Sequence, residues 1–345
     1  MRQVVVHIGL EKAASTSFQA SLVAARDRLG ENQIVYPQIG GGGAKDQRDL
    51  RFALEGHSAA IARTSAALRA AADVGERLVL SGETLYYAEP RSLLRLLASS
   101  GWGGVPVTAV AIVREPAGWL NSRYAFETVQ FRHRVRFSRF LARRLKPDFP
   151  LWPTLLARWQ EAEGITLVAV PLRAVGDPRR AIARTIAAMG IDPCLVPEGS
   201  ELNEALDPRT VEAGRRLAFY GIGNVIGQPF HRRVRSAMLE AAEAEGFNGR
   251  FQALDAGLMD EIDASVAPSL EHFASTVWNA RWCDVYDRGA REYGPVNEWG
   301  RGPARAEDEA AIRRVVAAVR RGADLRGRLL RQLLPSLAGR FGTKG

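Results

Sequence analysis

A lysine-containing turn joins an apolar strand to a helix near the start of the chain. The apolar run 4–8 predicts a buried strand, and the turn after it reads Gly9-Leu10-Glu11-Lys12-Ala13-Ala14-Ser15-Thr16-Ser17. Backbone N–H groups, the helix dipole and nearby hydroxyls in such a turn form a cradle for an anion of phosphate size. Only four of the 47 basic residues are lysines, so a lysine in this turn is unusual for the chain and suggests a functional role. The alternative is an ordinary strand–loop–helix with a solvated lysine.

The spacing within this turn differs from that of an ATP or GTP site. A nucleoside triphosphate P-loop places its lysine directly before the Ser or Thr that opens the helix. That position holds Ala14 here, and the lysine comes earlier, at Lys12. The spacing therefore favours an anion other than a triphosphate. A P-loop kinase-type phosphotransferase stays as the alternative enzyme.

A second set of polar residues follows another apolar run. Residues 105–113 predict a buried parallel strand, and Arg114-Glu115-Pro116 follows it directly. Ser122 and Tyr124 come one to two turns into the next predicted helix. A guanidinium gives planar, charge-assisted donors to phosphate oxygens, and a serine hydroxyl adds a neutral donor. This pattern predicts a second anion-binding site.

The two motifs together resemble those of sulfotransferases that use 3′-phosphoadenylyl sulfate (PAPS), in particular the bacterial carbohydrate-type members. His7-Ile8-Gly9 and Ser17-Phe18-Gln19 on either side of the turn strengthen the resemblance, which reaches over roughly residues 3–220. Ala14 stands where the family usually has glycine, and alanine fits there if its φ is negative. The resemblance implies a 3′-phosphate site at Arg114 and Ser122, and a 5′-phosphosulfate site at Lys12, Ala13, Ala14, Ser15, Thr16 and Ser17.

The resemblance also implies catalytic roles. Lys12 is expected to neutralise the oxygen that leaves with the nucleotide, as in other reactions catalysed by positioning and electrostatics. Glu83, in Ser81-Gly82-Glu83 at the end of the predicted strand 77–81, is the expected base for the acceptor hydroxyl. His7 is the rival base, or else fixes the turn by hydrogen bonding, and Glu11 is a third candidate. No metal is expected, because no His, Cys and Asp cluster has ligand spacing.

Strands alternating with helices predict the fold class. We expect an α/β, P-loop-type three-layer fold, with a central, mainly parallel sheet flanked by helices and a C-terminal helical region. Helices alone are expected after about residue 200, including one around 268–293. The predicted organisation is a sulfotransferase-like domain over 1–300, with 200–300 mainly helical, and a basic amphipathic helical tail over 301–345. The predicted strands are 4–8, 33–36, 77–81, 105–113 and 165–170.

Positive charge gathers in two segments. The net charge is +9, and residues 301–345 supply most of it, with eleven basic and four acidic residues. This tail fits a peripheral helix on an anionic membrane, and packing on the body of the protein or on a partner subunit fits equally. The segment 132–146 holds seven basic residues and no acid. It fits either a wall that attracts anionic ligands or the outer face of an amphipathic helix.

These observations favour an enzyme that moves a sulfuryl group from PAPS to a hydroxyl of a carbohydrate or glycolipid, releasing adenosine 3′,5′-bisphosphate (PAP). No run of 18 apolar residues or secretory signal is seen, so the expected location is the cytoplasm, with a peripheral membrane contact as one interpretation of the tail. No nucleic acid is an expected partner. A non-enzymatic nucleic-acid- or membrane-binding protein is the alternative from another class.

Overall fold

The chain forms two compact units in the computed structural model. The first unit comprises Met1–Trp119, Pro147–Glu204 and Asp263–Arg291, and the second comprises Leu120–Lys146, Ala205–Ile262 and Glu292–Gly345. Both are therefore interleaved along the sequence, and the division expected at residue 300 stays a prediction. The structure describes residues 2–40, 47–146, 150–177, 180–197, 205–222, 229–287, 295–299 and 305–322.

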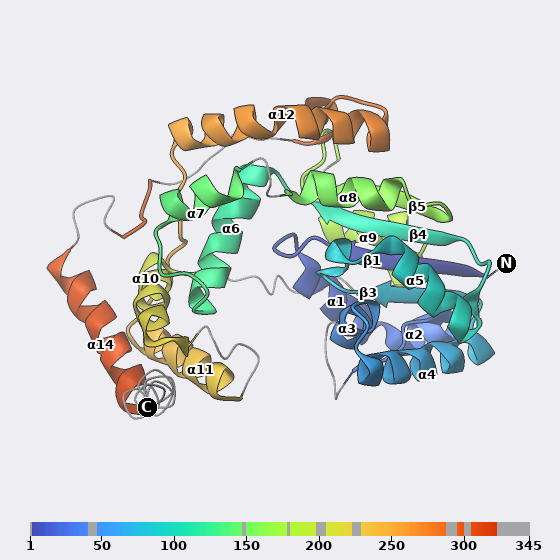
Figure 1. Cartoon of the computed structure of the whole chain (residues 1–345), viewed down its shortest axis with the longest axis horizontal. Helices are drawn as coiled ribbons and strands as arrows, with labels where there is room; N and C mark the ends of the chain where they lie inside the picture. Colours follow the sequence, from blue (N-terminus) through green and yellow to red (C-terminus); the bar gives the residue numbers. More distant parts are fainter. Residues whose placement is uncertain are drawn as a thin grey trace, which may run out of the picture. The chain divides into compact units, whose positions relative to one another are not determined.

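A five-stranded parallel sheet forms the centre of the first unit. Its strand order is β2-β3-β1-β4-β5, and helices lie on both sides of it (Figure 1). The predicted α/β three-layer architecture is confirmed, and the sheet is wholly parallel. The strands are β1 (Gln3–Gly9), β2 (Ile34–Val35), β3 (Arg77–Ser81), β4 (Val107–Val113) and β5 (Ile165–Pro171).

The apolar sequences of β1 and β4 explain why these two strands lie inside the sheet. Val4, Val5 and Val6 are fully buried, as are residues 109–113 of β4. Strands covered by helices on both faces have no solvent side, so they show continuous apolar runs instead of alternation. The register pairs Val5 with Val79 of β3 and with Thr108 of β4. The carboxyl ends of β1, β3 and β4 therefore lie side by side, and each leads into a predicted site segment.

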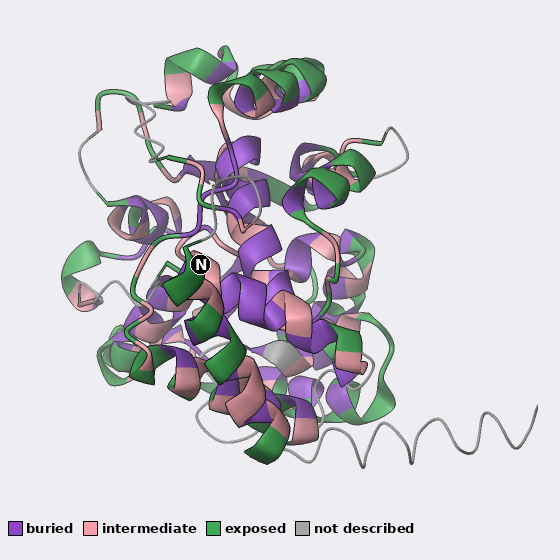
Figure 2. Ribbon diagram, turned by 90° about the vertical axis from the view of Figure 1, so that its left-hand side faces the viewer, coloured by how far each residue is buried: buried purple, intermediate pink, exposed green. Residues whose placement is uncertain are grey.

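Many helices of the chain have a buried and an exposed side (Figure 2), and in the first unit α4 (Ser58–Val74) buries the side that carries Ala60, Thr64 and Leu68. One helix of the first unit, over residues 48–54, was not predicted from the sequence. The α-helices are α1 (Ser15–Ala24), α2 (Arg26–Glu31), α3 (Arg48–Leu54), α4 (Ser58–Val74), α5 (Pro90–Leu97), α8 (Trp152–Gln160), α9 (Ala181–Ala188) and α13 (Trp282–Val285). The shorter turns are the 3-10 helices Leu85–Tyr87 and Pro193–Leu195 and the π-helix Ala98–Trp102.

Two long helices run from one unit into the other, α6 (Pro116–Val129) and α12 (Ala256–Trp278). The expectation that the second begins near residue 268 is wrong. The Asp255 carboxylate accepts a hydrogen bond from the Leu258 N–H at 2.8 Å, which caps the helix start twelve residues earlier than Pro268. Pro268 lies inside the helix, where it removes one backbone hydrogen bond without ending it.

Helices make up the described part of the second unit. The basic tail begins with a helix whose Ile312, Val315 and Val319 are buried against the unit. Arg216 and Glu309 join it to the neighbouring helix at 2.7 Å. Packing on the body therefore explains the first half of the tail, and residues 323–345 lie outside the described residues. The helices are α7 (Phe137–Arg144), α10 (Pro208–Leu217), α11 (Pro229–Ala244) and α14 (Ala306–Gly322), with a 3-10 turn Ala218–Tyr220.

No helix in the described part of the chain is both long and apolar enough to cross a membrane.

Candidate functional site

The turn between β1 and α1 adopts an unusual backbone conformation. Gly9 has a φ of 132°, and Lys12 and Ala14 have φ values of 64° and 63°, with Ala13 on the negative side between them. An alternation of left- and right-handed residues turns successive N–H groups toward one side, as in anion-binding nests. The Ser15 hydroxyl closes the turn by donating to the Leu10 carbonyl at 2.5 Å. The turn therefore has the backbone geometry of an anion cradle.

The condition under which alanine would fit easily at position 14, a negative φ, is not met. Ala14 is the residue before α1, adopts the left-handed conformation, and supplies no side-chain capping bond. This conformation costs an L-residue other than glycine roughly 1–2 kcal/mol. The chain thus keeps the backbone that a glycine would favour while carrying an alanine.

Ala14→Gly is expected to stabilise the protein. The free energy of unfolding should rise by about 0.5–1 kcal/mol, because glycine adopts positive φ without steric cost. Ala13→Gly is the matched control in the same turn, since Ala13 is fully buried and has a negative φ. That control should lower the free energy of unfolding by about 1 kcal/mol. Urea denaturation measures both, and equal effects of the two substitutions would contradict the assigned strain.

The residues after β4 contact this turn directly. Arg114 Nη1 donates to the Lys12 carbonyl at 3.1 Å, and the indole N–H of Trp119 donates to the Glu11 carbonyl at 3.1 Å. The connections from β1 and β4 leave toward opposite edges of the sheet, so this is a topological switch point, where open parallel sheets bind ligands. The structure therefore brings Lys12 and Arg114 together at one edge of the sheet.

Ser122 is the other residue predicted for the second anion site. It is half-buried on α6, in the part of that helix that belongs to the second unit. A common role with Arg114 stays a prediction. Among the residues predicted for the first site, Ala13, Ser15 and Ser17 are buried, and Lys12, Ala14 and Thr16 are half-buried.

Two carboxylates lie near the turn. The chain after β3 approaches Gly9 so closely that a Cβ there would lie 2.7 Å from the Glu83 carbonyl oxygen. Position 9 therefore requires glycine, both for its φ and for this close approach. Glu83 is half-buried, and so is Glu11, whose Oε1 lies 3.4 Å from the Tyr87 hydroxyl. Both candidate bases are thus carried by segments that meet at the turn.

His7 lies deeper, under the turn. It is fully buried on β1, and its Nδ1 is 2.9 Å from the Ser81 hydroxyl on β3. Gln19 Nε2 donates to the same hydroxyl oxygen at 3.2 Å, so the Ser81 hydroxyl links His7 to Gln19. Burial lowers the pKa of His7 to about 3, and an interaction with the Gly9 backbone opposes this only in part. A neutral, inaccessible imidazole favours the positioning role over that of the base.

Sequence reasoning missed three residues that build this site. Trp119 binds the turn, Gln47 accepts a hydrogen bond from the Ser81 N–H at 3.0 Å, and Tyr286 donates to Glu115 beside Arg114 at 2.5 Å. Trp119 lies only five residues after Arg114, at the start of the helix that the strand–Arg–Pro pattern predicts, so its proximity was readable. No local pattern points to Gln47 or Tyr286.

Metal-binding groups were sought among the described residues as well. No group of three or more His, Cys, Asp or Glu side chains there is arranged to hold a metal ion. Cys194 and Cys283 are exposed and free.

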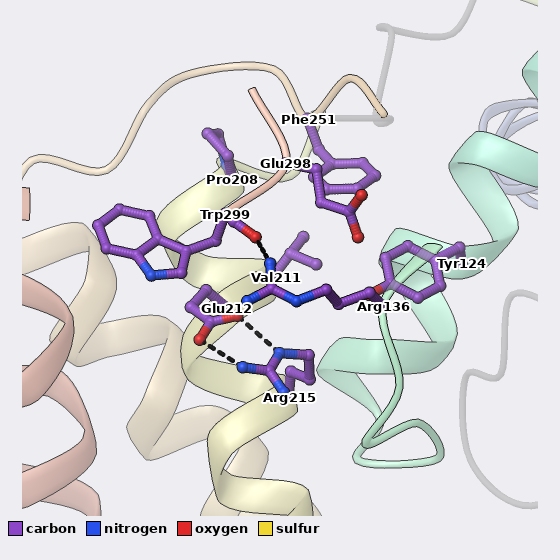
Figure 3. A pocket seen from close by; sticks show the side chains of 9 residues that line it. All are labelled: Tyr124, Arg136, Pro208, Val211, Glu212, Arg215, Phe251, Glu298 and Trp299. Atoms are coloured by element: carbon purple, nitrogen blue, oxygen red, sulfur yellow. Dashed lines mark hydrogen bonds and ion pairs between the residues drawn. The ribbon is translucent and has the colours of Figure 1, made fainter. Parts of the chain in front are cut away.

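A pocket in the second unit is filled by the protein's own interactions (Figure 3). It is lined by residues of α6 and α10, by Arg136 just before α7, and by Phe251, Glu298 and Trp299. Glu212 and Arg215 pair across two hydrogen bonds of 2.7 Å, and Arg136 donates to the Trp299 carbonyl. Glu298 is buried and accepts a hydrogen bond from the Phe137 N–H at 2.6 Å. Because these charged groups already bind one another, the candidate site is the switch point in the first unit.

The chain was compared with protein-family models, curated proteins and solved structures, and none of them matches it.

Proposed function

We propose that this protein is a PAPS-dependent sulfotransferase acting on a hydroxyl of a carbohydrate or glycolipid. The observation that carries the proposal is the contact of Arg114 with the Lys12 carbonyl, where β1 and β4 end side by side. Lys12 and Arg114 lie at one edge of the sheet. The sequence motifs associate Lys12 with the 5′-phosphosulfate and Arg114 with the 3′-phosphate of one nucleotide. A donor with two anionic groups on one adenosine suits that arrangement.

Each residue of the site has a proposed part. The N–H groups of 13–17 and the Ser15, Thr16 and Ser17 hydroxyls bind the 5′-phosphosulfate. Lys12 stabilises negative charge on the departing phosphate oxygen, and Arg114 binds the 3′-phosphate. Glu83 accepts the acceptor's proton, with Glu11 as the alternative. The donor supplies the sulfuryl group, and PAP is the product.

The spacing of the turn separates this proposal from a kinase. A kinase-type P-loop needs a lysine where this chain has Ala14, and would bind ADP with magnesium. A sulfotransferase should instead bind PAP with no added metal. Nothing in the geometry of the turn favours the kinase.

Thermal unfolding in the presence of nucleotides tests the proposal. PAP should raise the unfolding temperature, because a ligand that binds only the folded state adds about 2.7 kcal/mol of stability at a hundred times its Kd. ADP, with or without magnesium, should have little effect. Stronger stabilisation by ADP with magnesium than by PAP would contradict the proposal. Release of PAP from PAPS on addition of glycan or glycolipid acceptors then tests the transfer itself.

Arg114→Ala is expected to weaken the binding of PAP roughly ten- to a hundredfold, since a charge-assisted hydrogen bond contributes about 1.5–3 kcal/mol. Adenosine 5′-monophosphate (AMP), which lacks the 3′-phosphate, should lose less affinity. Arg114→Lys is the matched variant, because it keeps the charge but not the planar fork of donors. Isothermal titration calorimetry measures these affinities, and equal losses for PAP and AMP would show that Arg114 acts only by supporting the turn.

A further inference from the structure

Glu115 lies between Arg114 and a tyrosine that is distant in sequence. The Tyr286 hydroxyl donates to Glu115 Oε2 at 2.5 Å, and Glu115 Oε1 lies 3.8 Å from Arg114 Nε. That second distance exceeds a hydrogen bond. Arg114 and Glu115 are neighbours with 18% of each side chain exposed. The carboxylate is thus hydrogen-bonded to the tyrosine through one oxygen, while its other oxygen forms a longer ion pair with the arginine.

Tyr286 is held rigidly in place. It is 1% exposed, and its ring stacks on Trp282 with centroids 4.8 Å apart and planes 8° from parallel. Backbone contacts fix the same segment to the chain after β5, through the Val175 N–H to the Val285 carbonyl at 3.0 Å and a bridge between Ala174 and Tyr286. The hydroxyl therefore points at Glu115 from a fixed platform.

Gly118 leaves the room that this arrangement needs. A Cβ at Gly118 would lie 2.0 Å from Glu115 Oε1 and 3.2 Å from Arg114 Nη2. Both side chains thus lie over the first turn of α6, in the space where any larger residue would put its Cβ. A side chain at position 118 would push the carboxylate away from its present place.

The Glu115 carboxylate favours the protonated form of the Tyr286 hydroxyl, which donates the hydrogen bond between them. Burial and the adjacent Glu115 carboxylate raise the pKa of Tyr286 far above its ordinary value. The hydroxyl therefore acts as a hydrogen-bond donor to the carboxylate. Loss of this donor would favour a closer approach of the carboxylate to the neighbouring guanidinium, because hydrogen bonds between ionised partners are roughly twice as strong as neutral ones.

We infer that Tyr286 is a positioning residue whose hydroxyl holds Glu115 back from Arg114 and so leaves the guanidinium for the 3′-phosphate of the nucleotide. The inference rests on the proposed function. It differs from a merely structural role, because it predicts an effect that depends on the 3′-phosphate of the ligand and on the negative charge of Glu115.

Tyr286→Phe tests this inference, since it removes the hydroxyl and keeps the stacked ring. Binding of PAP should weaken by about tenfold, the effect of roughly one charged hydrogen bond, whereas binding of AMP should change by less than about twofold. Glu115→Gln should bind PAP more tightly than the wild type, because the competing anion is gone. The double variant Tyr286→Phe/Glu115→Gln should recover the affinity that Tyr286→Phe loses.

The matched control is Tyr36→Phe, another buried tyrosine of the first unit at the far edge of the sheet. It should leave the PAP affinity of the wild type. Equal losses of PAP and AMP affinity in Tyr286→Phe, or no recovery in the double variant, would overturn the inference while wild-type binding of PAP upholds the proposed function. A wild-type protein that binds PAP no better than AMP overturns both.

Discussion

Lys12→Ala is expected to lower the rate of sulfuryl transfer by about 10²–10³-fold, the loss typical of removing one group that stabilises charge developing in the transition state. The backbone of the turn should persist, because its geometry is fixed by the Ser15 hydroxyl on Leu10 and by Arg114 on the Lys12 carbonyl, which any residue at position 12 retains. PAP affinity should therefore fall less than the rate. Steady-state kinetics with PAPS and a hydroxyl acceptor measure the effect.

Lys146→Ala is the control for this experiment. Lys146 is an exposed lysine of the second unit, so its removal changes the net charge of the protein equally without touching the turn. It should leave the rate unchanged. A Lys12→Ala variant with the wild-type rate, or one whose loss is matched by Lys146→Ala, would refute the role assigned to Lys12.

The sheet was predictable because its sequence signal is local. Strands buried on both faces need continuous apolar and β-branched runs, and β1, β3, β4 and β5 each have one. The start of α12 was not predicted, because Pro268 is a stronger signal of a break than Asp255 is of a beginning. In the folded helix the Asp255 carboxylate caps the start, and the helix continues through Pro268 with one backbone hydrogen bond fewer.

Part of the site was predictable for a different reason. Lys12 and Arg114 each follow a strand, and parallel strands that are neighbours place such residues at one edge of the sheet. The hydrogen bond from Tyr286 to Glu115 was not predictable. Tyr286 is 171 residues away from Glu115 and lies in the helical part of the chain after β5. The φ of Ala14 was also beyond the sequence, since alanine ordinarily signals the opposite backbone conformation.

Two basic side chains of the segment 132–146 are paired with an acid that lies outside the segment, so the count of charges within it overstates its free positive charge. Its residues include His133 and Arg144, and these bind a carboxylate that precedes the segment, Glu127. Arg132, Arg139 and Arg143 are exposed, as the outer face of an amphipathic helix would be. Phe137, Phe140 and Leu141 are buried on the other face of α7. Part of the positive charge is therefore structural, and it depends on a single acid.

Glu127 is 4% exposed, and three basic side chains surround it. Arg123 Nε lies at 2.7 Å from its carboxylate, His133 Nε2 at 2.5 Å and Arg144 Nη2 at 3.1 Å. Burial alone would raise the pKa of Glu127, but the hydrogen bond with His133 and the charges of Arg123 and Arg144 outweigh it and lower the pKa to about 2. The ionised carboxylate therefore stabilises the second unit.

Glu127→Gln is expected to lower the free energy of unfolding by about 3–5 kcal/mol at pH 7, because it leaves three largely buried basic groups without their acid. The sign of the pH dependence follows from the depressed pKa. In the wild type the stabilisation is fully present above pH 4.5, the value for an unfolded glutamate, and is lost as the pH falls toward about 2. That loss is on the order of 3 kcal/mol, and it should be absent from the variant.

Urea denaturation of the full chain between pH 7 and pH 2 measures both effects, and Glu245→Gln is the control. Glu245 also binds an arginine, Arg314, at 2.7 Å, but that arginine is 60% exposed, so solvent screens the pair and its loss should change stability far less. If Glu127→Gln were no more destabilising than Glu245→Gln, or kept the wild-type fall in stability at acid pH, the carboxylate would not be what holds these basic groups inside the unit. The same result would favour the other interpretation of the segment 132–146, a wall that attracts anionic ligands.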